Sequence, residues 1–204
     1  MDRIRACGAC DRGSTPLEGT MSKRVFIIHG WGGYPDQGWL LDLKIELQER
    51  GFLVYSPAMP DTHNPDIGKW VVHLGNIVNE PEITDCFIGY SLGSQAIMRY
   101  LENLPENKKV GRVVFIAGFL RLMNLDKEEE TALAPWLKEP INLANIKKHC
   151  DKFTAVFSND DPIVPLSNKD DFEEKLGAKI IIKNKMGHFD NLEDVSFIAD
   201  EIIL

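Results

Sequence analysis

Short, continuously apolar runs rich in β-branched and aromatic residues recur along the chain from residue 23 onward. A run that is apolar at every position suits a strand covered on both faces, as in a parallel sheet, whereas strict alternation would indicate a half-exposed strand. We therefore expect strands that are buried on both faces at residues 25–28, 53–55, 86–88, 113–116, 154–157 and 180–182.

Between most of these runs, apolar residues return every three or four positions, which is the spacing of an amphipathic helix. Such stretches lie at residues 40–47, 67–78, 96–101 and 192–202. Gly51 follows the first of them, where a residue of positive φ ends many helices. Alternating strands and helices imply right-handed crossovers and parallel strands. We predict an α/β fold, with a mostly parallel central sheet and helices on both faces, forming a single domain over residues 21–204.

Residues 1–20 do not follow this pattern, because they hold several arginines and glycines and almost no apolar periodicity. We expect a flexible extension, or a start-site or cloning artefact, with Met21 as the real start. No apolar segment follows the arginines, so a signal peptide is not indicated. Cys7 and Cys10 form a C-x-x-C pair that lacks both the further ligands of a zinc site and the strand–helix context of a redox site.

Composition and charge exclude several classes of protein. The 204 residues are 44% hydrophobic and 26% charged, which is typical of a globular domain, and the net charge of −8 opposes binding to nucleic acid or to an anionic membrane surface. The longest apolar stretch, residues 113–120, is too short to span a bilayer. Cys86 and Cys150 have no paired spacing and are read as ordinary thiols of a reducing compartment. We expect a soluble, cytoplasmic protein.

The segment Gly89-Tyr90-Ser91-Leu92-Gly93 follows the third expected strand and precedes a helical stretch. The pattern G-x-S-x-G is typical of a tight strand-to-helix turn that lifts a serine hydroxyl above the sheet, with glycines where the backbone is crowded. A helix N-terminus also favours developing negative charge. Ser91 could instead be only a helix N-cap in a glycine-rich turn. The strand and helix on either side favour a nucleophile.

Two more strand ends carry acid–base residues. The loop after the fifth expected strand holds Asp160 and Asp161, and the residues alone leave open which carboxylate would orient a histidine, or whether either is only a turn or cap residue. His188 follows the sixth strand and is the candidate general base. The order of Ser91, an aspartate and His188 along the chain is that of α/β-hydrolases.

The glycine-rich segment after the first strand, residues 29–33, could stabilise an oxyanion. We expect the backbone N–H groups of Trp31 and Leu92 to be the two donors. His29 is expected to brace this loop, with a contact to substrate as the alternative. The segment lacks G-x-G-x-x-G and the chain has no Walker motif, so neither NAD nor ATP is implied.

These segments together resemble a known family, the small serine hydrolases of the retinoblastoma-binding protein nine and YdeN group. The resemblance extends over about residues 23–204 and rests on residues 26–35, 39–40, 89–93, 158–165 and 187–189. It implies an α/β-hydrolase fold with a minimal cap and a Ser-His-Asp triad.

The same resemblance selects Asp161, because the family's aspartate immediately precedes proline in an Asp-Asp-Pro sequence. It also implies that residues 59–70 form a loop and helix over the site. The chain has no Leu-x-Cys-x-Glu motif, so binding to a pocket protein is not carried over and any protein partner is unknown.

We hypothesise a carboxylesterase-like serine hydrolase that cleaves a small ester, thioester or amide through an acyl-enzyme, without metal or cofactor. Ser91 would be the nucleophile, His188 the base and Asp161 the residue that orients the base. The competing hypothesis is a hydrolase fold kept as a protein-interaction module with weak or vestigial activity. Because residues 119–145 are too few for a lid domain, we expect a pocket that is shallow or walled by short loops.

Overall fold

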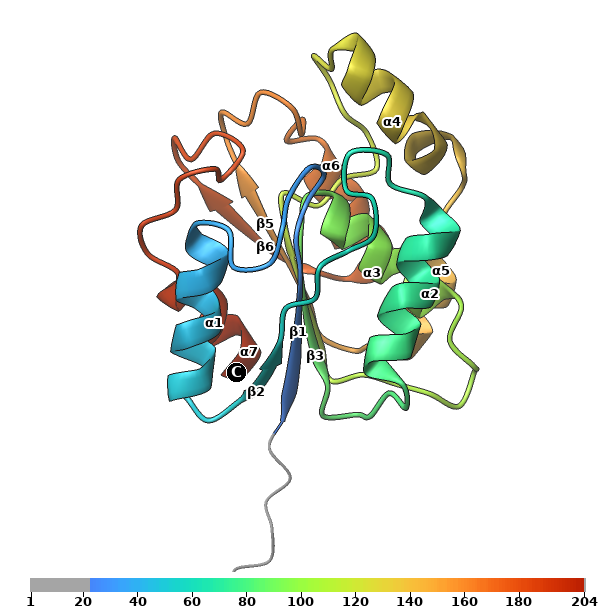
Figure 1. Ribbon diagram of the computed structural model, residues 1–204, viewed down its shortest axis with the longest axis vertical. Coiled ribbons are helices and arrows are strands. Elements are labelled where there is room, and N and C mark those ends of the chain that lie inside the picture. Colours follow the sequence, from blue (N-terminus) through green and yellow to red (C-terminus); the bar gives the residue numbers. More distant parts are fainter. Residues whose placement is uncertain (1–22, 204) are drawn as a thin grey trace, which may run out of the picture.

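The computed structural model describes residues 23–203 and is built around one parallel six-stranded sheet (Figure 1). All five strand pairings are parallel, in the order β2-β1-β3-β4-β5-β6. The strands are β1 (Arg24–Ile28), β2 (Leu53–Tyr55), β3 (Cys86–Tyr90), β4 (Arg112–Ile116), β5 (Phe153–Ser158) and β6 (Lys179–Lys183). The α/β prediction is confirmed. The expected extension, with Cys7 and Cys10, lies outside the described residues.

Burial separates the central strands from the edge strands. Every residue of β5 is buried, and in each of β1, β3 and β4 every residue but one is buried, as continuous apolar runs predict. The prediction of burial on both faces is wrong for β2 and β6, where Leu53 is 47% exposed and Ile182 is 45% exposed. These two strands end the sheet and have a neighbouring strand on one side only, so their covering is incomplete.

Helices cover both faces of the sheet. Helices α1 (Trp39–Glu49) and α7 (Ser196–Ile203) pack together on one face, while α3 (Leu92–Glu102) packs with α2 (Ile67–Val78) and α5 (Leu143–His149) on the other (Figure 1). The remaining helical segments are α4 (Lys127–Lys138), α6 (Asn168–Asp171) and the π-helical turn η1 (Phe172–Leu176). No helix within residues 23–203 is both long and apolar enough to cross a lipid bilayer.

The last helix is shorter than the apolar spacing predicts. It begins at Ser196, whose N–H donates to the Asp194 carboxylate at 2.9 Å, and this capping contact marks its start. Leu192 and Val195 are buried, but they reach the core from the preceding loop. An apolar side chain can be buried from a loop as well as from a helix, and the spacing alone does not distinguish the two.

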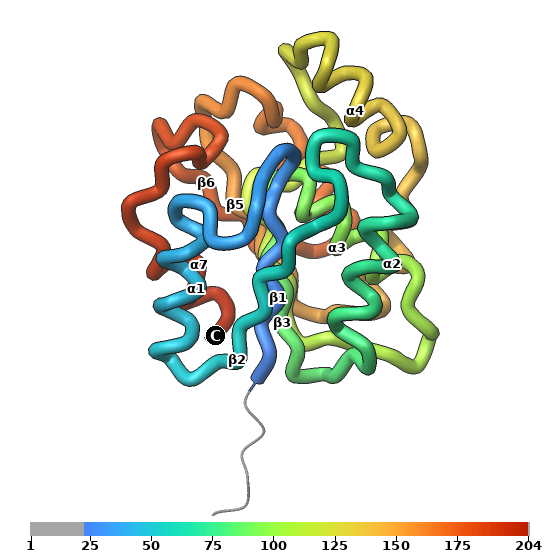
Figure 2. The backbone as a smooth tube through the Cα atoms, in the orientation of Figure 1, coloured from blue at the N-terminus to red at the C-terminus, as the bar shows by residue number. Residues whose placement is uncertain are grey.

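The strand order reverses at β1, the second strand from one edge of the sheet. From β1 the chain moves outward to β2 and then returns to β3 on the other side of β1. Such a reversal opens a crevice beyond the carboxyl ends of β1 and β3, where α/β proteins bind ligands. Figure 2 shows the loops that follow β1 and β2 side by side at this end, and the Gly32 N–H donates to the Thr62 carbonyl at 2.8 Å.

Helix α4 stands at the same end of the molecule (Figures 1 and 2). Its first turn is a capping box, in which the Asp126 carboxylate accepts the Glu129 N–H and the Glu129 carboxylate accepts the Asp126 N–H. At its other end, the buried Arg99 guanidinium donates to the carbonyls of Trp136 at 3.0 Å and Glu139 at 2.9 Å. The segment of residues 119–145, which is too short for a lid domain, thus includes a helix that is fixed at both ends.

Candidate active site

Ser91 lies at a sharp turn between β3 and α3. Its φ of 50° and ψ of −116° are unusual for a residue with a side chain and cost about 1–3 kcal/mol, a strain typical of functional sites. A Cβ at Gly93 would lie 2.1 Å from the Ile28 carbonyl oxygen, and one at Gly89 would lie 2.7 Å from the Ser94 nitrogen. Glycine is therefore required on both sides of Ser91. The serine hydroxyl makes no capping bond to α3, so the alternative of a simple N-cap is not observed.

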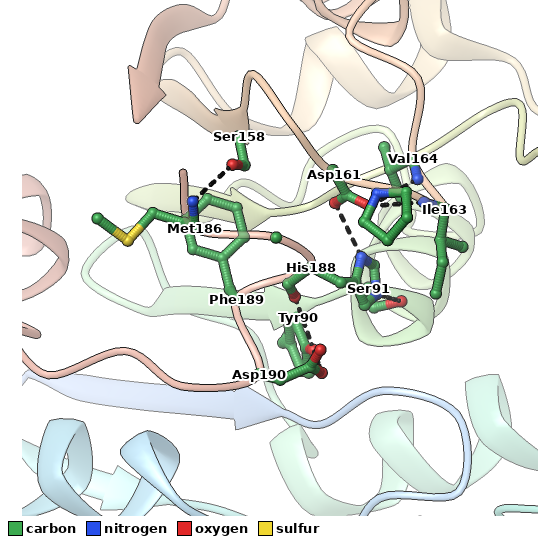
Figure 3. Close-up of polar contacts among 12 residues, drawn as sticks. Tyr90, Ser91, Ser158, Asp161, Ile163, Val164, Met186, His188, Phe189 and Asp190 are labelled. Atoms are coloured by element: carbon green, nitrogen blue, oxygen red, sulfur yellow. Dashed lines mark hydrogen bonds and ion pairs between the residues drawn. The ribbon is translucent and has the colours of Figure 1, made fainter. Parts of the chain in front are cut away.

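The Ser91 hydroxyl, the His188 ring and the Asp161 carboxylate form a continuous hydrogen-bonded chain (Figure 3). His188 Nε2 is 3.0 Å from Ser91 Oγ, and His188 Nδ1 is 2.8 Å from Asp161 Oδ2. Asp161 and His188 are both buried. A carboxylate facing Nδ1 keeps the proton on that nitrogen, so the Nε2 lone pair faces the serine hydroxyl.

Asp161 is held by its second oxygen. Asp161 Oδ1 accepts the backbone N–H groups of Ile163 at 2.8 Å and Val164 at 2.9 Å. These bonds fix the rotation of the carboxylate, so that Oδ2 points to the imidazole (Figure 3).

The neighbouring Asp160 has a different position and different partners. Its Oδ1 accepts the Ser158 hydroxyl at 2.7 Å and the Gly187 N–H at 3.0 Å, and these hydrogen bonds lower the pKa of the Asp160 carboxyl. Ser158 Oγ in turn accepts the Met186 N–H at 3.0 Å (Figure 3). Asp160 therefore joins the loop after β5 to the loop after β6, and of the two aspartates only Asp161 contacts His188.

The loop carrying His188 is held by two side chains from elsewhere in the chain. The Tyr90 hydroxyl lies 2.9 Å from the His188 carbonyl and 3.3 Å from an Asp190 carboxylate oxygen, both within donating distance (Figure 3). The Trp39 indole donates to the Phe189 carbonyl at 2.7 Å. Burial raises the pKa of the Tyr90 phenol, which keeps it a donor. Sequence reasoning missed both contacts, although Tyr90 occupies an x position of the G-x-S-x-G motif.

His29 is fully engaged with the backbone. Its Nδ1 lies 2.9 Å from the Gly30 carbonyl, and its Nε2 accepts the Met59 N–H at 3.1 Å, so the proton is assigned to Nδ1. Burial lowers the pKa of His29, which favours the neutral ring. The ring braces the glycine-rich loop against the segment after β2. Because both nitrogens are used, it has no free nitrogen to offer a substrate.

The glycine-rich loop lies directly against Ser91. A Cβ at Gly30 would be 3.2 Å from the Ser91 Cβ, and the Trp31 indole donates to the His63 carbonyl at 3.1 Å. Within residues 23–203, neither the Trp31 N–H nor the Leu92 N–H donates to another residue. Leu92 is the first residue of α3, where an N–H has no partner inside the helix.

A pocket of about 200 Å³ opens at Ser91 and His188. One wall comes from the segment that includes the first half of α4, through Leu122, Leu125, Glu129 and Leu133. The expectation that residues 59–70 cover the site is not met, since none of them lines this pocket. Thr62 and His63 contact the glycine-rich loop instead, since their carbonyls accept the Gly32 N–H and the Trp31 indole N–H.

The rest of the described chain shows no second cluster of this kind. A larger hollow of about 730 Å³ between α2 and α4 shares no lining residue with the Ser91 pocket. In the described part of the chain, no group of three or more His, Cys, Asp or Glu side chains is placed to hold a metal ion. Cys86 and Cys150 are free thiols, and burial raises the pKa of each to about 11.

The parallel sheet, the strained serine turn and the crevice at the strand reversal define the class of the protein as an α/β-hydrolase. A model of the serine hydrolase family matches residues 25–196, and the chain belongs to that family.

Individual relatives agree with this assignment. The chain is 29% identical over 184 residues to the putative hydrolase YdeN of Bacillus subtilis, covering 90% of this chain and 93% of that protein. It is 28% identical over 165 residues to the serine hydrolase RBBP9 of Rattus norvegicus, covering 81% of each. The crystal structure of the B. subtilis ydeN product superposes with a TM-score of 0.78 at 24% identity, over 89% of this chain and 99% of that one. The expected resemblance is confirmed.

Proposed function

We propose that this hydrolase is carboxylesterase-like and cleaves a small ester, thioester or amide through an acyl-enzyme on Ser91. The observation that carries the proposal is the hydrogen-bonded chain from Ser91 through His188 to Asp161. Structures of carboxylesterases from Nitrososphaera gargenis and Bacillus subtilis share the fold, at 16% and 13% identity and with TM-scores of 0.67 and 0.60. These similarities support the fold alone, so the argument for ester cleavage rests on the site.

In the acylation step, Ser91 Oγ attacks the carbonyl carbon of the substrate as His188 Nε2 takes the hydroxyl proton. Asp161 holds the proton on Nδ1 and stabilises the imidazolium that forms. His188 then gives its proton to the leaving alcohol, thiol or amine as the carbon–heteroatom bond breaks. In the second half, a water loses its proton to Nε2 and attacks the acyl-enzyme, and the Ser91 oxygen leaves with that proton.

The negative charge of the tetrahedral intermediate needs donors aimed at the oxygen that bears it. We assign this role to the Trp31 and Leu92 N–H groups, which flank Ser91 and have no other acceptor in the described residues. Each such donor typically contributes about 10² to 10³ in rate. The bracing of the loop by His29 sets the position of the Trp31 N–H before substrate arrives.

The proposal is tested by labelling with a fluorophosphonate, which reacts with an activated serine and needs no knowledge of the natural substrate. Wild type, Ser91→Ala and His188→Ala are treated with the reagent, and the modified residue is located by mass spectrometry of peptides. Ser167→Ala is the matched control, because Ser167 is exposed and its side chain caps no helix.

We expect one adduct on Ser91 in wild type and in Ser167→Ala, and no adduct in the other two variants. An adduct on a different serine would refute the assignment of the nucleophile. The absence of any adduct on folded wild-type protein would refute the proposal and favour an interaction module on a hydrolase fold.

A further inference from the structure

Beside the aromatic, glutamine and glycine residues near Ser91, two groups of side chains distinguish the walls of the pocket. Four aliphatic side chains line one part of it, namely Leu122, Leu125, Leu133 and Ile163. Two carboxylate residues, Glu129 and Asp190, line another part. No lysine or arginine is among the lining residues. A substrate in this pocket therefore meets apolar surface and negative charge, with no cation to receive an anionic group.

Neither carboxylate is neutralised by a basic side chain. Within residues 23–203, no lysine or arginine forms an ion pair with Glu129 or Asp190. Their hydrogen bonds come from neutral donors, the Asp126 N–H at 2.8 Å for Glu129 and the Tyr90 hydroxyl at 3.3 Å for Asp190. Glu129 is half-buried, whereas Asp190 is exposed. A carboxylate without a counter-charge attracts a cation and repels an anion, and it does so more strongly where it is partly removed from water, as at Glu129.

The position of Glu129 is fixed by the fold. Its carboxylate is one half of the capping box that begins α4, so one oxygen is held at the helix end beside the pocket. The next residue, Glu130, is exposed and does not line the pocket. Adjacent glutamates on one helix thus differ in whether they face the reacting site.

From this arrangement we infer that the pocket selects acyl substrates by charge, with Glu129 as the main specificity-determining residue. The favoured substrate is an ester whose acyl group combines a short aliphatic chain with an ammonium group. A carboxylate at the same place on the acyl chain is disfavoured. This inference rests on the proposed function, since it assumes that Ser91 is acylated in this pocket.

The test uses three phenyl esters of similar length, those of 6-aminohexanoic acid, hexanoic acid and adipic acid (the monoester), which end in an ammonium, a methyl and a carboxylate group. The value of kcat/KM is measured from phenol release at low ionic strength for wild type, Glu129→Gln and the matched control Glu130→Gln. Glutamine preserves the capping-box acceptor, so α4 is expected to remain folded, and circular dichroism checks this. Each rate is corrected for spontaneous hydrolysis.

In wild type, kcat/KM for the ammonium ester is expected to exceed that for the carboxylate ester by at least about tenfold. The partly solvated Glu129 carboxylate attracts the first substrate and repels the second, so both interactions enter the ratio. Glu129→Gln should reduce that ratio about fivefold, and Glu130→Gln should leave it unchanged. Raising the salt concentration to about 0.5 M should reduce the wild-type ratio, because screening weakens interactions between solvated charges.

Equal rates for the charged esters, or an equal effect of the two glutamine variants, would overturn the role of Glu129. Turnover of none of the three esters by a protein whose Ser91 is labelled by fluorophosphonate would overturn the substrate class and leave the proposed function standing. Absence of both turnover and label would refute the proposed function itself.

Discussion

Replacing Asp161 by asparagine isolates one hydrogen bond in the site. Asparagine has the same shape, and its oxygen can still accept the two backbone N–H groups that Asp161 Oδ1 accepts. Its amide NH₂ then faces His188 Nδ1, where the carboxylate oxygen was 2.8 Å away. An NH₂ donor forces Nδ1 to become the acceptor and moves the ring proton to Nε2. In that tautomer Nε2 has no lone pair to take the proton of Ser91.

The expected loss is about 10⁴-fold in kcat, equivalent to about 5 kcal/mol of transition-state stabilisation. Asp160→Asn is a matched control at the next position. Its side-chain oxygen can still accept the Ser158 hydroxyl and the Gly187 N–H, so its rate should lie within about threefold of wild type.

The assay is steady-state hydrolysis of phenyl hexanoate by both variants, with thermal unfolding followed by circular dichroism to show that each is folded. The argument would be refuted if Asp161→Asn retained more than about a tenth of the wild-type kcat, since the wrong tautomer cannot support such a rate. It would also be refuted if the two variants lost activity equally.

Three further outcomes are expected. Gly93→Ala should lower the free energy of unfolding by about 3 kcal/mol or more, because its Cβ would lie 2.1 Å from a backbone oxygen. Gly75→Ala within α2 should instead raise the free energy of unfolding by about 0.5–1 kcal/mol, because its Cβ would meet no atom nearer than 3.9 Å. Urea unfolding measures both changes. Tyr90→Phe should lower kcat about tenfold with little change in KM, since it frees the loop that carries the base, and a change in KM alone would contradict this positioning role. The lowered pKa of His29 means that below about pH 6.5 the unfolded chain takes up a proton that the folded protein does not, so the free energy of unfolding should fall from pH 7.5 to 5.5, and less so in His29→Asn. If the free energy of unfolding fell equally in His29→Asn, His29 would not be the source of the pH dependence.

The positions of the strands could be predicted from the sequence because burial on both faces requires an apolar residue at every position. The pattern failed at the edges of the sheet, since β2 and β6 have apolar sequences although they are partly exposed. A run of apolar residues can reflect strand propensity as well as burial. It does not show which strand has a neighbour on one side only.

The residues alone placed Ser91, His188 and a pair of aspartates at strand ends, and the family resemblance selected Asp161. In the structure His188 lies within hydrogen-bonding distance of both Ser91 and Asp161; the catalytic roles of the three stay predictions. The particular side chains of α4 that line the pocket and the contacts of Tyr90 could not be predicted. Bonds from a side chain to a distant backbone carbonyl depend on how loops meet in space, and they leave no periodic pattern in the chain.

The hydrogen bond between Ser91 and His188 joins residues 97 positions apart, and the one from His188 to Asp161 joins residues 27 apart. His188 follows β6, an edge strand that pairs only with β5. A molecule in which β6 were detached from β5 would keep Ser91 in its turn after β3 but would lack the base beside it. Turnover therefore counts only molecules in which this edge strand is in place.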